Sequence, residues 1–242
     1  MNFAAELELS HNTMPLARTH RLRAAVAALV AANVAAFGGF QLPKIDNPFD
    51  SRPGVTVGKL QVALANEDMR ATKVVAQAAA KFESDRSRRA LPDFVNDVAT
   101  QLCRRRGDWL YASCAGERFD GGAVERDDHE VAYNRLVNAE AAKFEVERMP
   151  SQGELESTAA GVRGMCVVSL VVALEGDLLD AFTDAARSEA SLSDALADVA
   201  AACLVRGGDA LYNAEVLWTP SSADEALFKD DALLDFPELL QL

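Results

Sequence analysis

The feature that most constrains the fold is the run MCVVSLVVAL at Met165–Leu174, in which Ser169 is the only polar residue. Its β-branched residues favour a strand, and the glycines at Gly164 and Gly176 bound it. A strand without polar alternation is typical of a central position in a sheet that is covered on both faces. The run is too short to cross a bilayer as a helix. The sequence therefore predicts a sheet on which helices pack in layers.

Three further segments have the composition and alternation of strands: Val55–Asn66, Asp108–Cys114 and Ala210–Thr219. In the first, Leu60, Val62 and Leu64 recur with a period of two. The pair Gly58–Lys59 shifts this period relative to the preceding valines, which predicts a β-bulge. The segment GERFDGGAVERDD, after the second strand, is predicted to be its exit loop.

Four segments carry apolar residues at helical spacing: Met69–Phe82, Leu91–Leu102, Tyr133–Phe144 and Leu192–Cys203. Gly107 is predicted to close the second helix in a left-handed cap. Ser191 or Ser193 is predicted to begin the last helix. The resulting order is strand-helix-helix-strand-helix-strand-helix-strand. It predicts an α+β class, with one domain over residues 55–242 and about four strands in one sheet layered by helices.

The first 54 residues are predicted to lie outside this domain. Residues 24–43 carry no charge and follow the basic residues Arg18, Arg21 and Arg23. This layout fits a cleavable targeting signal, a membrane or membrane-surface anchor, or a soluble helix. Residues 44–54, KIDNPFDSRPG, are predicted to form a linker.

Charge narrows the range of functions. The net charge of −13 excludes nucleic-acid binding as the main task, because phosphates repel so acidic a chain. From Asp177 to Leu242, 14 acidic residues stand against three basic ones. The segment after Pro220, which we call the acidic tail, has apolar residues between Leu227 and Leu240. They predict short turns that pack on the domain; a partner peptide is the alternative.

Basic residues cluster at Arg104, Arg105 and Arg106, at the end of the second predicted helix. Cations there favour the negative end of the helix dipole. Only one or two of the three lie well for this role, so the run is also a candidate docking site for a partner or a lipid surface.

The sequence shows no arrangement typical of catalysis. There are three histidines, and phosphate-loop, zinc-protease and nucleophile-elbow motifs are absent. We therefore expect a non-enzymatic protein with no catalytic or metal-ligating residue and no cofactor. The four cysteines, scattered in apolar surroundings, predict buried thiols, with one disulfide as the alternative.

Trp218 is the remaining candidate. It shares the strand phase of Tyr212, Ala214 and Val216, which predicts a buried side chain. An exposed Trp218 is instead a strong candidate for an interaction site. A further hypothesis is a pocket between the sheet and the helices, lined by Trp109, Tyr111 and Trp218, that binds a small molecule or pigment.

Two stretches resemble a known family, Domain of Unknown Function 1517. Its closing signature is matched by Val216–Pro220, VLWTP, and by the acidic segment that ends in Asp235, Phe236, Pro237 and Leu239. Its opening strand is matched by Leu60–Val62, LQV, and the likeness covers Val55 to Leu242.

The resemblance implies a setting for the protein. Members occur in cyanobacteria and plastids, usually with a membrane segment ahead of the domain, and plant members are linked to photosynthetic acclimation. It implies a thylakoid or envelope protein whose uncharged segment, residues 24–43, meets the membrane. We expect an accessory or regulatory protein that acts through protein contacts, possible interaction residues being Arg104, Arg105, Arg106 and Trp218.

Overall fold

The computed structural model describes residues 52–85, 87–121, 126–144, 164–221 and 225–242. They belong to one compact unit, Ile45–Leu242. The predicted targeting or membrane segment, residues 24–43, lies outside the described residues. Residues 44–51 of the predicted linker also lie outside them.

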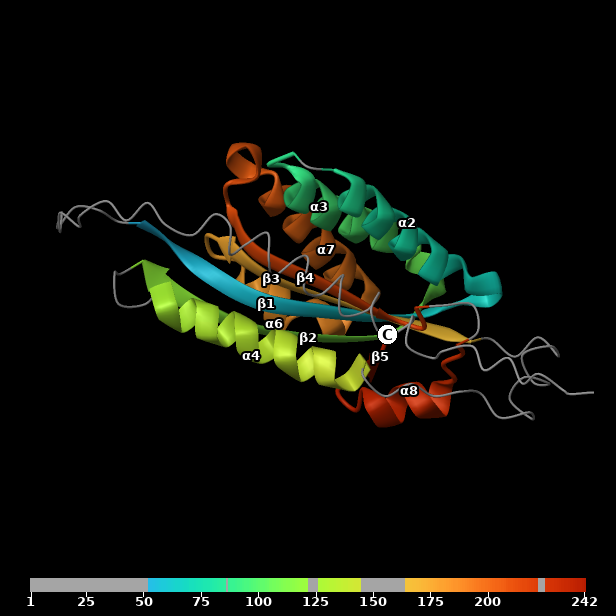
Figure 1. Ribbon diagram of the computed structural model, residues 1–242. Coiled ribbons are helices and arrows are strands. Elements are labelled where there is room, and N and C mark those ends of the chain that lie inside the picture. The colour runs from blue at the N-terminus through green and yellow to red at the C-terminus, as the bar shows by residue number, and fades with distance from the viewer. Residues whose placement is uncertain (1–51, 86, 122–125, 145–163, 222–224) are drawn as a thin grey trace, which may run out of the picture. The chain divides into compact units, whose positions relative to one another are not determined.

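The strands form one antiparallel sheet in the order β4-β3-β1-β2-β5 (Figure 1). Their bounds are Arg52–Ala65 (β1), Trp109–Gly121 (β2), Met165–Glu175 (β3), Leu211–Thr219 (β4) and Leu240–Gln241 (β5). The predicted α+β class and the single sheet are confirmed. The sheet has five strands rather than about four, because two residues of the acidic tail pair with Tyr111 and Ala112 of β2.

Helices cover both faces of the sheet (Figure 1). Over one face lie α2 (Arg70–Ser84), α3 (Ala90–Arg104), α6 (Leu179–Thr183) and α7 (Glu189–Cys203). Over the other lie α4 (Arg126–Phe144) and α8 (Lys229–Asp235). Short 3-10 turns complete the described elements: Glu67–Met69, Arg106–Asp108, Ala185–Arg187 and Val205–Gly208. We call the two sides the α3 face and the α4 face.

The apolar run of β3 explains this layering. Ten consecutive residues of β3, from Met165 to Leu174, are buried. Alternate residues enter different cores, so that Leu170 packs on the α3 face and Val171 on the α4 face. The predicted central strand, covered on both sides, is confirmed.

The acidic tail packs on the domain, as predicted. Leu227, Phe236 and Leu239 are buried on the α4 face beside Tyr111 and Met165. Exposure of these residues to water is thereby avoided, which is the driving force for folding the tail back onto the sheet.

Three features that the sequence predicts for the strands are wrong: a bulge, a loop and the phase of one side chain. β1 pairs without interruption through Gly58 and Lys59, so there is no bulge there. β2 continues through the predicted exit loop to Gly121, because those residues pair with the start of β1. The predicted phase of Tyr212 is also wrong, because the register shifts between Ala173 and Leu174 of β3 and turns this ring toward His129 of α4.

Two predicted helix caps are also wrong. Helix α7 begins one turn earlier than predicted, because Ser188 is extended and its hydroxyl accepts a hydrogen bond from the Ser191 amide at 3.1 Å. Helix α3 ends at Arg104 with Arg105 as its cap, and Gly107 lies inside the following 3-10 turn rather than in a left-handed cap.

The glycine at position 58 has a packing role instead. Phe182 of α6 is fully buried, and a Cβ atom at Gly58 would lie 2.2 Å from its ring. Gly116, which pairs with Gly58 across β1 and β2, would place a Cβ 2.5 Å from the Phe182 Cβ. The two glycines thus form a notch that admits the aromatic ring close to the sheet backbone.

We expect Gly58→Ala to destabilise the domain by about 1–3 kcal/mol in denaturant unfolding, because the added methyl group overlaps the Phe182 ring. Gly107→Ala is the matched control, since a Cβ there meets nothing within 4 Å. Equal stability of the two variants would contradict the notch.

Candidate functional site

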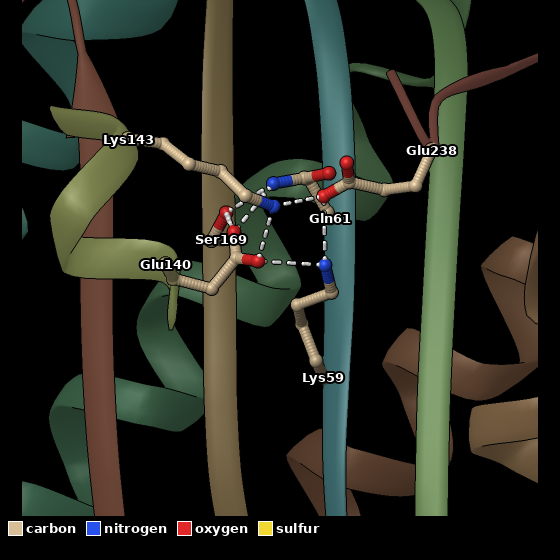
Figure 2. Close-up of polar contacts among 6 residues, drawn as sticks. All are labelled: Lys59, Gln61, Glu140, Lys143, Ser169 and Glu238. Atoms are coloured by element: carbon tan, nitrogen blue, oxygen red, sulfur yellow. Dashed lines mark hydrogen bonds and ion pairs between the residues drawn. The ribbon is translucent and has the colours of Figure 1, made fainter. Parts of the chain in front are cut away.

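The α4 face contains a group of polar side chains within an otherwise apolar layer. It is built from two adjacent strands, from α4 and from the segment after α8 (Figure 2). Its members are Lys59, Gln61, Glu140, Lys143, Ser169 and Glu238, which we call the polar cluster.

Period-two alternation places the strand members of the polar cluster. Lys59 and Gln61 lie on the same face of β1 as Val57 and Ala63. Gln61 pairs with Ser169 of β3 in the register, so these side chains are neighbours. The sheet therefore presents three polar groups side by side beneath α4.

The charged members form two linked ion pairs. Lys59 Nζ lies 2.7 Å from Glu140 Oε1 and 3.0 Å from Glu238 Oε1. Lys143 Nζ lies 2.7 Å from Glu140 Oε1 and also contacts Glu238 Oε1. Figure 2 shows the two lysine nitrogens between the two carboxylates. Two positive and two negative charges thus balance one another.

The neutral members hold the second oxygen of Glu140. Gln61 Nε2 donates to Glu140 Oε2 at 2.7 Å, and Ser169 Oγ donates to it at 2.9 Å. Gln61 Nε2 also donates to Ser169 Oγ at 2.7 Å. Glu140, which is 2% exposed, therefore accepts hydrogen bonds on both oxygens. This compensates for the loss of hydration on burial.

The ionisation of the cluster follows from these contacts. Burial lowers the pKa of Lys143, but its hydrogen bonds to Glu140 and Glu238 outweigh burial and raise it above the ordinary lysine value. Burial raises the pKa of Glu238, but hydrogen bonds from Lys143, a backbone amide and Lys59 lower it below the ordinary value. Lys143 and Glu238 are therefore both charged at neutral pH, and the Glu238 carboxylate serves as an ion-pair acceptor.

One atom of the cluster has no partner. Gln61 Oε1 is buried and accepts no hydrogen bond from the residues that the structure describes. Turning the amide over would direct this oxygen at the Glu140 carboxylate, so the present orientation is the favourable one. The polar cluster therefore links β1, β3, α4 and the tail, and the Gln61 Oε1 acceptor stays unused.

Glu215 of β4 is a second buried acid on the α4 face. It is 8% exposed, and burial raises the pKa of its carboxyl to about 7. Burial, followed by the nearby Glu215, also raises the pKa of Tyr133 on α4. Within the described ranges no cation lies at ion-pair distance from Glu215.

The arginine run is partly engaged within the domain. Arg105 Nη1 lies 3.4 Å from Asp108 Oδ2, and Arg106 Nε lies 3.0 Å from Glu189 Oε2. Arg104 is exposed at the last residue of α3, and its guanidinium has no ion-pair partner in the part of the chain that the structure describes. Arg104 alone thus retains a free charge for docking.

The three aromatic residues of the pocket hypothesis do not share one site. Trp109 and Trp218 pack on the α3 face, whereas Tyr111 packs on the α4 face. The register shift between Ala63 and Leu64 turns consecutive odd residues of β2 to opposite sides. Trp218 is partly buried, and its Nε1 has no acceptor among the described residues.

The described residues hold no group of three or more His, Cys, Asp or Glu side chains that could bind a metal ion. The four cysteines are unpaired, and burial raises the pKa of Cys166 and of Cys203 to about 12. Among the described helices none is both long and apolar enough to cross a membrane.

Sequence reasoning missed the polar cluster, although a signal for Glu140 was present. The apolar stripe of α4 includes Tyr133, Leu136 and Val137, and position 140 continues it at i+7. An acid in that position predicts a buried charge. Its cations on distant segments, however, cannot be identified by spacing.

We expect Glu140→Ala to destabilise the domain by about 3–5 kcal/mol, because it leaves the buried Lys59 and the partly buried Lys143 with half of their counter-charge. Asp209→Asn, which removes the exposed ion pair with Arg88, is the control and should cost less than about 1 kcal/mol. Urea unfolding of both variants measures the difference. A loss for Glu140→Ala no larger than for the control would show that the polar cluster adds no stability.

Glu215 makes stability depend on pH. Burial raises the pKa of Glu215 in the folded protein from 4.5 to about 7, so the folded state binds this proton more tightly than the unfolded state does. The stability that this proton contributes is fully present below the unfolded pKa and is lost as the pH rises through the folded pKa. We therefore expect Glu215→Gln to gain stability over the parent chain between about pH 5 and pH 8, by on the order of 2–3 kcal/mol.

The measurement is the difference in unfolding free energy between the two chains across this pH range. Glu117→Gln, at an exposed position on β2, is the control and should show a flat difference. A flat difference for Glu215→Gln as well would mean that its carboxyl titrates normally.

Comparison with known proteins gives a family but no activity. No curated protein and no solved structure matches the chain. A family described as "Protein of unknown function (DUF1517)" matches residues 54–242, which is more than half of the chain and includes every described strand but for the first two residues of β1. The chain therefore belongs to the DUF1517 family.

Proposed function

We propose that this protein is a non-enzymatic accessory or regulatory protein of a photosynthetic membrane, and that it binds a protein partner along the outer edge of β4. The membrane setting is that implied by the family resemblance, with residues 24–43 as the segment that meets the membrane. The charges of the polar cluster are committed to one another, which favours a structural over a catalytic role for it.

The proposal rests on the outer edge of β4, which pairs with no further strand among the described residues. Among the described residues, this nine-residue strand pairs only with β3. Its sequence, LYNAEVLWT, contains no Lys, Arg or Pro. Soluble proteins commonly use such residues to keep exposed edges from pairing with other chains.

The opposite edge of the sheet differs. Along β2, beyond the two residues that pair with β5, the strand carries Glu117, Arg118 and Asp120. Arg118 forms ion pairs with Asp120 and, at 2.9 Å, with Asp177. Exposed charges therefore oppose strand pairing at that edge, whereas the only charged residue of β4 is Glu215, which is buried.

Aromatic residues stand near both ends of the β4 edge. Tyr212 is 41% exposed, and Trp218 is partly exposed. Tyr and Trp contribute large binding energies at protein interfaces. Arg104 is proposed as a secondary contact, because its charge is available. The competing pocket proposal lacks its converging aromatic residues and is not favoured.

The test uses the full chain in its native membranes. We expect it to co-migrate with a membrane complex on native gels, and Tyr212→Lys to reduce the bound fraction at least about tenfold, because a lysine on an edge opposes strand pairing. Val131→Lys is the matched control: Val131 is 67% exposed and lies on α4 rather than on β4, so a lysine there should leave strand pairing at the edge intact.

Unfolding measurements on both variants would check that they fold. Equal complex formation by Tyr212→Lys and Val131→Lys would show that the partner does not bind at the β4 edge. Migration of the parent chain as a free protein, after extraction that preserves membrane complexes, would contradict an accessory role.

A further inference from the structure

Glu215 lies at the middle of the β4 edge, opposite Val171 of β3. Its side chain is on the α4 face, where it is 8% exposed near Tyr133. The cost of burying a carboxyl is normally offset by a cation or by several hydrogen bonds. In the described ranges no side chain forms an ion pair or a hydrogen bond with this carboxyl.

The other buried acid on this face shows how the fold otherwise treats such a group. Glu140 is held by two lysines, a glutamine and a serine. Three of these partners, Lys59, Gln61 and Ser169, lie on the adjacent strands β1 and β3. Among the described residues β4 has a strand on one side only, where Val171 lies opposite Glu215. The side of Glu215 that lacks a partner is therefore the side on which another strand would lie.

A strand added at this edge would complete the site. Directly opposite residues of paired strands have Cβ atoms about 4.5–5.5 Å apart. A lysine or arginine opposite Glu215 would therefore have a side chain long enough to reach the carboxylate. The raised pKa of Glu215 is consistent with a carboxyl that lacks this cation in the unbound protein.

We propose that the β4 edge binds an extended segment of a partner protein that carries a lysine or arginine opposite Glu215. The inference rests on the proposed function, since it names the class of partner for the same edge. Residues two away from Glu215 are Asn213 and Leu217, so the segment should carry a polar residue on one side of its cation and an apolar one on the other. The residues between these positions would lie on the α3 face beside Ala214 and Val216, which favours apolar side chains there.

A second copy of the chain fits the edge less well. The β4 sequence contains no basic residue, so β4 of another molecule offers no cation to Glu215. A two-fold pairing centred on Glu215 would set two carboxyls opposite each other, which is destabilising. The partner is therefore a different chain, whose strand carries a basic residue at its centre.

The probe is a displayed library of random peptides about 12 residues long, selected on the immobilised full chain. We expect enrichment of sequences with apolar residues at alternate positions and one central lysine or arginine. Replacing that cation by glutamate should weaken binding of a synthetic peptide at least about tenfold. Amide resonances of β4 should shift on binding.

Two variants test the role of Glu215. Glu215→Gln has nearly the same shape, and its binding should no longer distinguish the lysine peptide from the glutamate peptide. Leu217→Lys supplies a cation in cis two residues away, and should abolish the preference for basic peptides. Gly107→Ala, in the turn before β2 where an added Cβ meets nothing within 4 Å, should bind as the parent chain does.

Several outcomes would overturn the inference: enrichment of peptides without a basic residue, no enrichment, an unchanged preference in Glu215→Gln, or self-association through β4 in ultracentrifugation. The proposed function is tested separately, by the effect of Tyr212→Lys on the membrane complex. If Tyr212→Lys still loses the membrane complex while the peptides show no basic preference, the edge binds a partner of different chemistry.

Discussion

The structure depends on the burial of β3 on both faces. A strand that is apolar on each side cannot lie against water, so each face requires a covering layer. Helices α2, α3, α6 and α7 provide one layer, and α4 with α8 provides the other. The folded tail follows from the same need, because α4 alone does not cover Ala63, Met165 and Val167, against which the tail residues pack.

The two layers are attached to the sheet in different ways. The α3 face is held by a continuous apolar core, with the Phe182 ring seated against Gly58 and Gly116. The α4 face has smaller apolar groups separated by the polar cluster. Ion pairs require a defined geometry, whereas apolar contacts tolerate sliding. The cluster therefore fixes the position of α4 and the tail on a face where packing alone would specify it less well.

Much of the fold could be predicted from the sequence, because it rests on local periodicity. The buried strand Met165–Leu174 and the helices that begin near Met69 and Leu91 have clear patterns, and the Trp-Thr-Pro segment indicated the family. β5 could not be predicted, since two residues give no periodic signal. Gly58 was interpreted as a bulge because its cause, the Phe182 ring, lies 124 positions away. The candidate site escaped for the same reason: Glu215 and Lys59 are significant only through neighbours on other strands.

The central place of β1 has a consequence for how the domain folds. β1 lies first among the described elements, yet it pairs with β2 and also with β3, where Leu60 meets Leu170. The polar cluster spans still more of the chain, with Lys59 bonded to Glu238 over a separation of 179 residues. Such distant contacts entail a large loss of chain entropy before they form, and proteins rich in them fold slowly. The α4 face should therefore be the last part of the domain to become ordered, and the first to open when the chain unfolds.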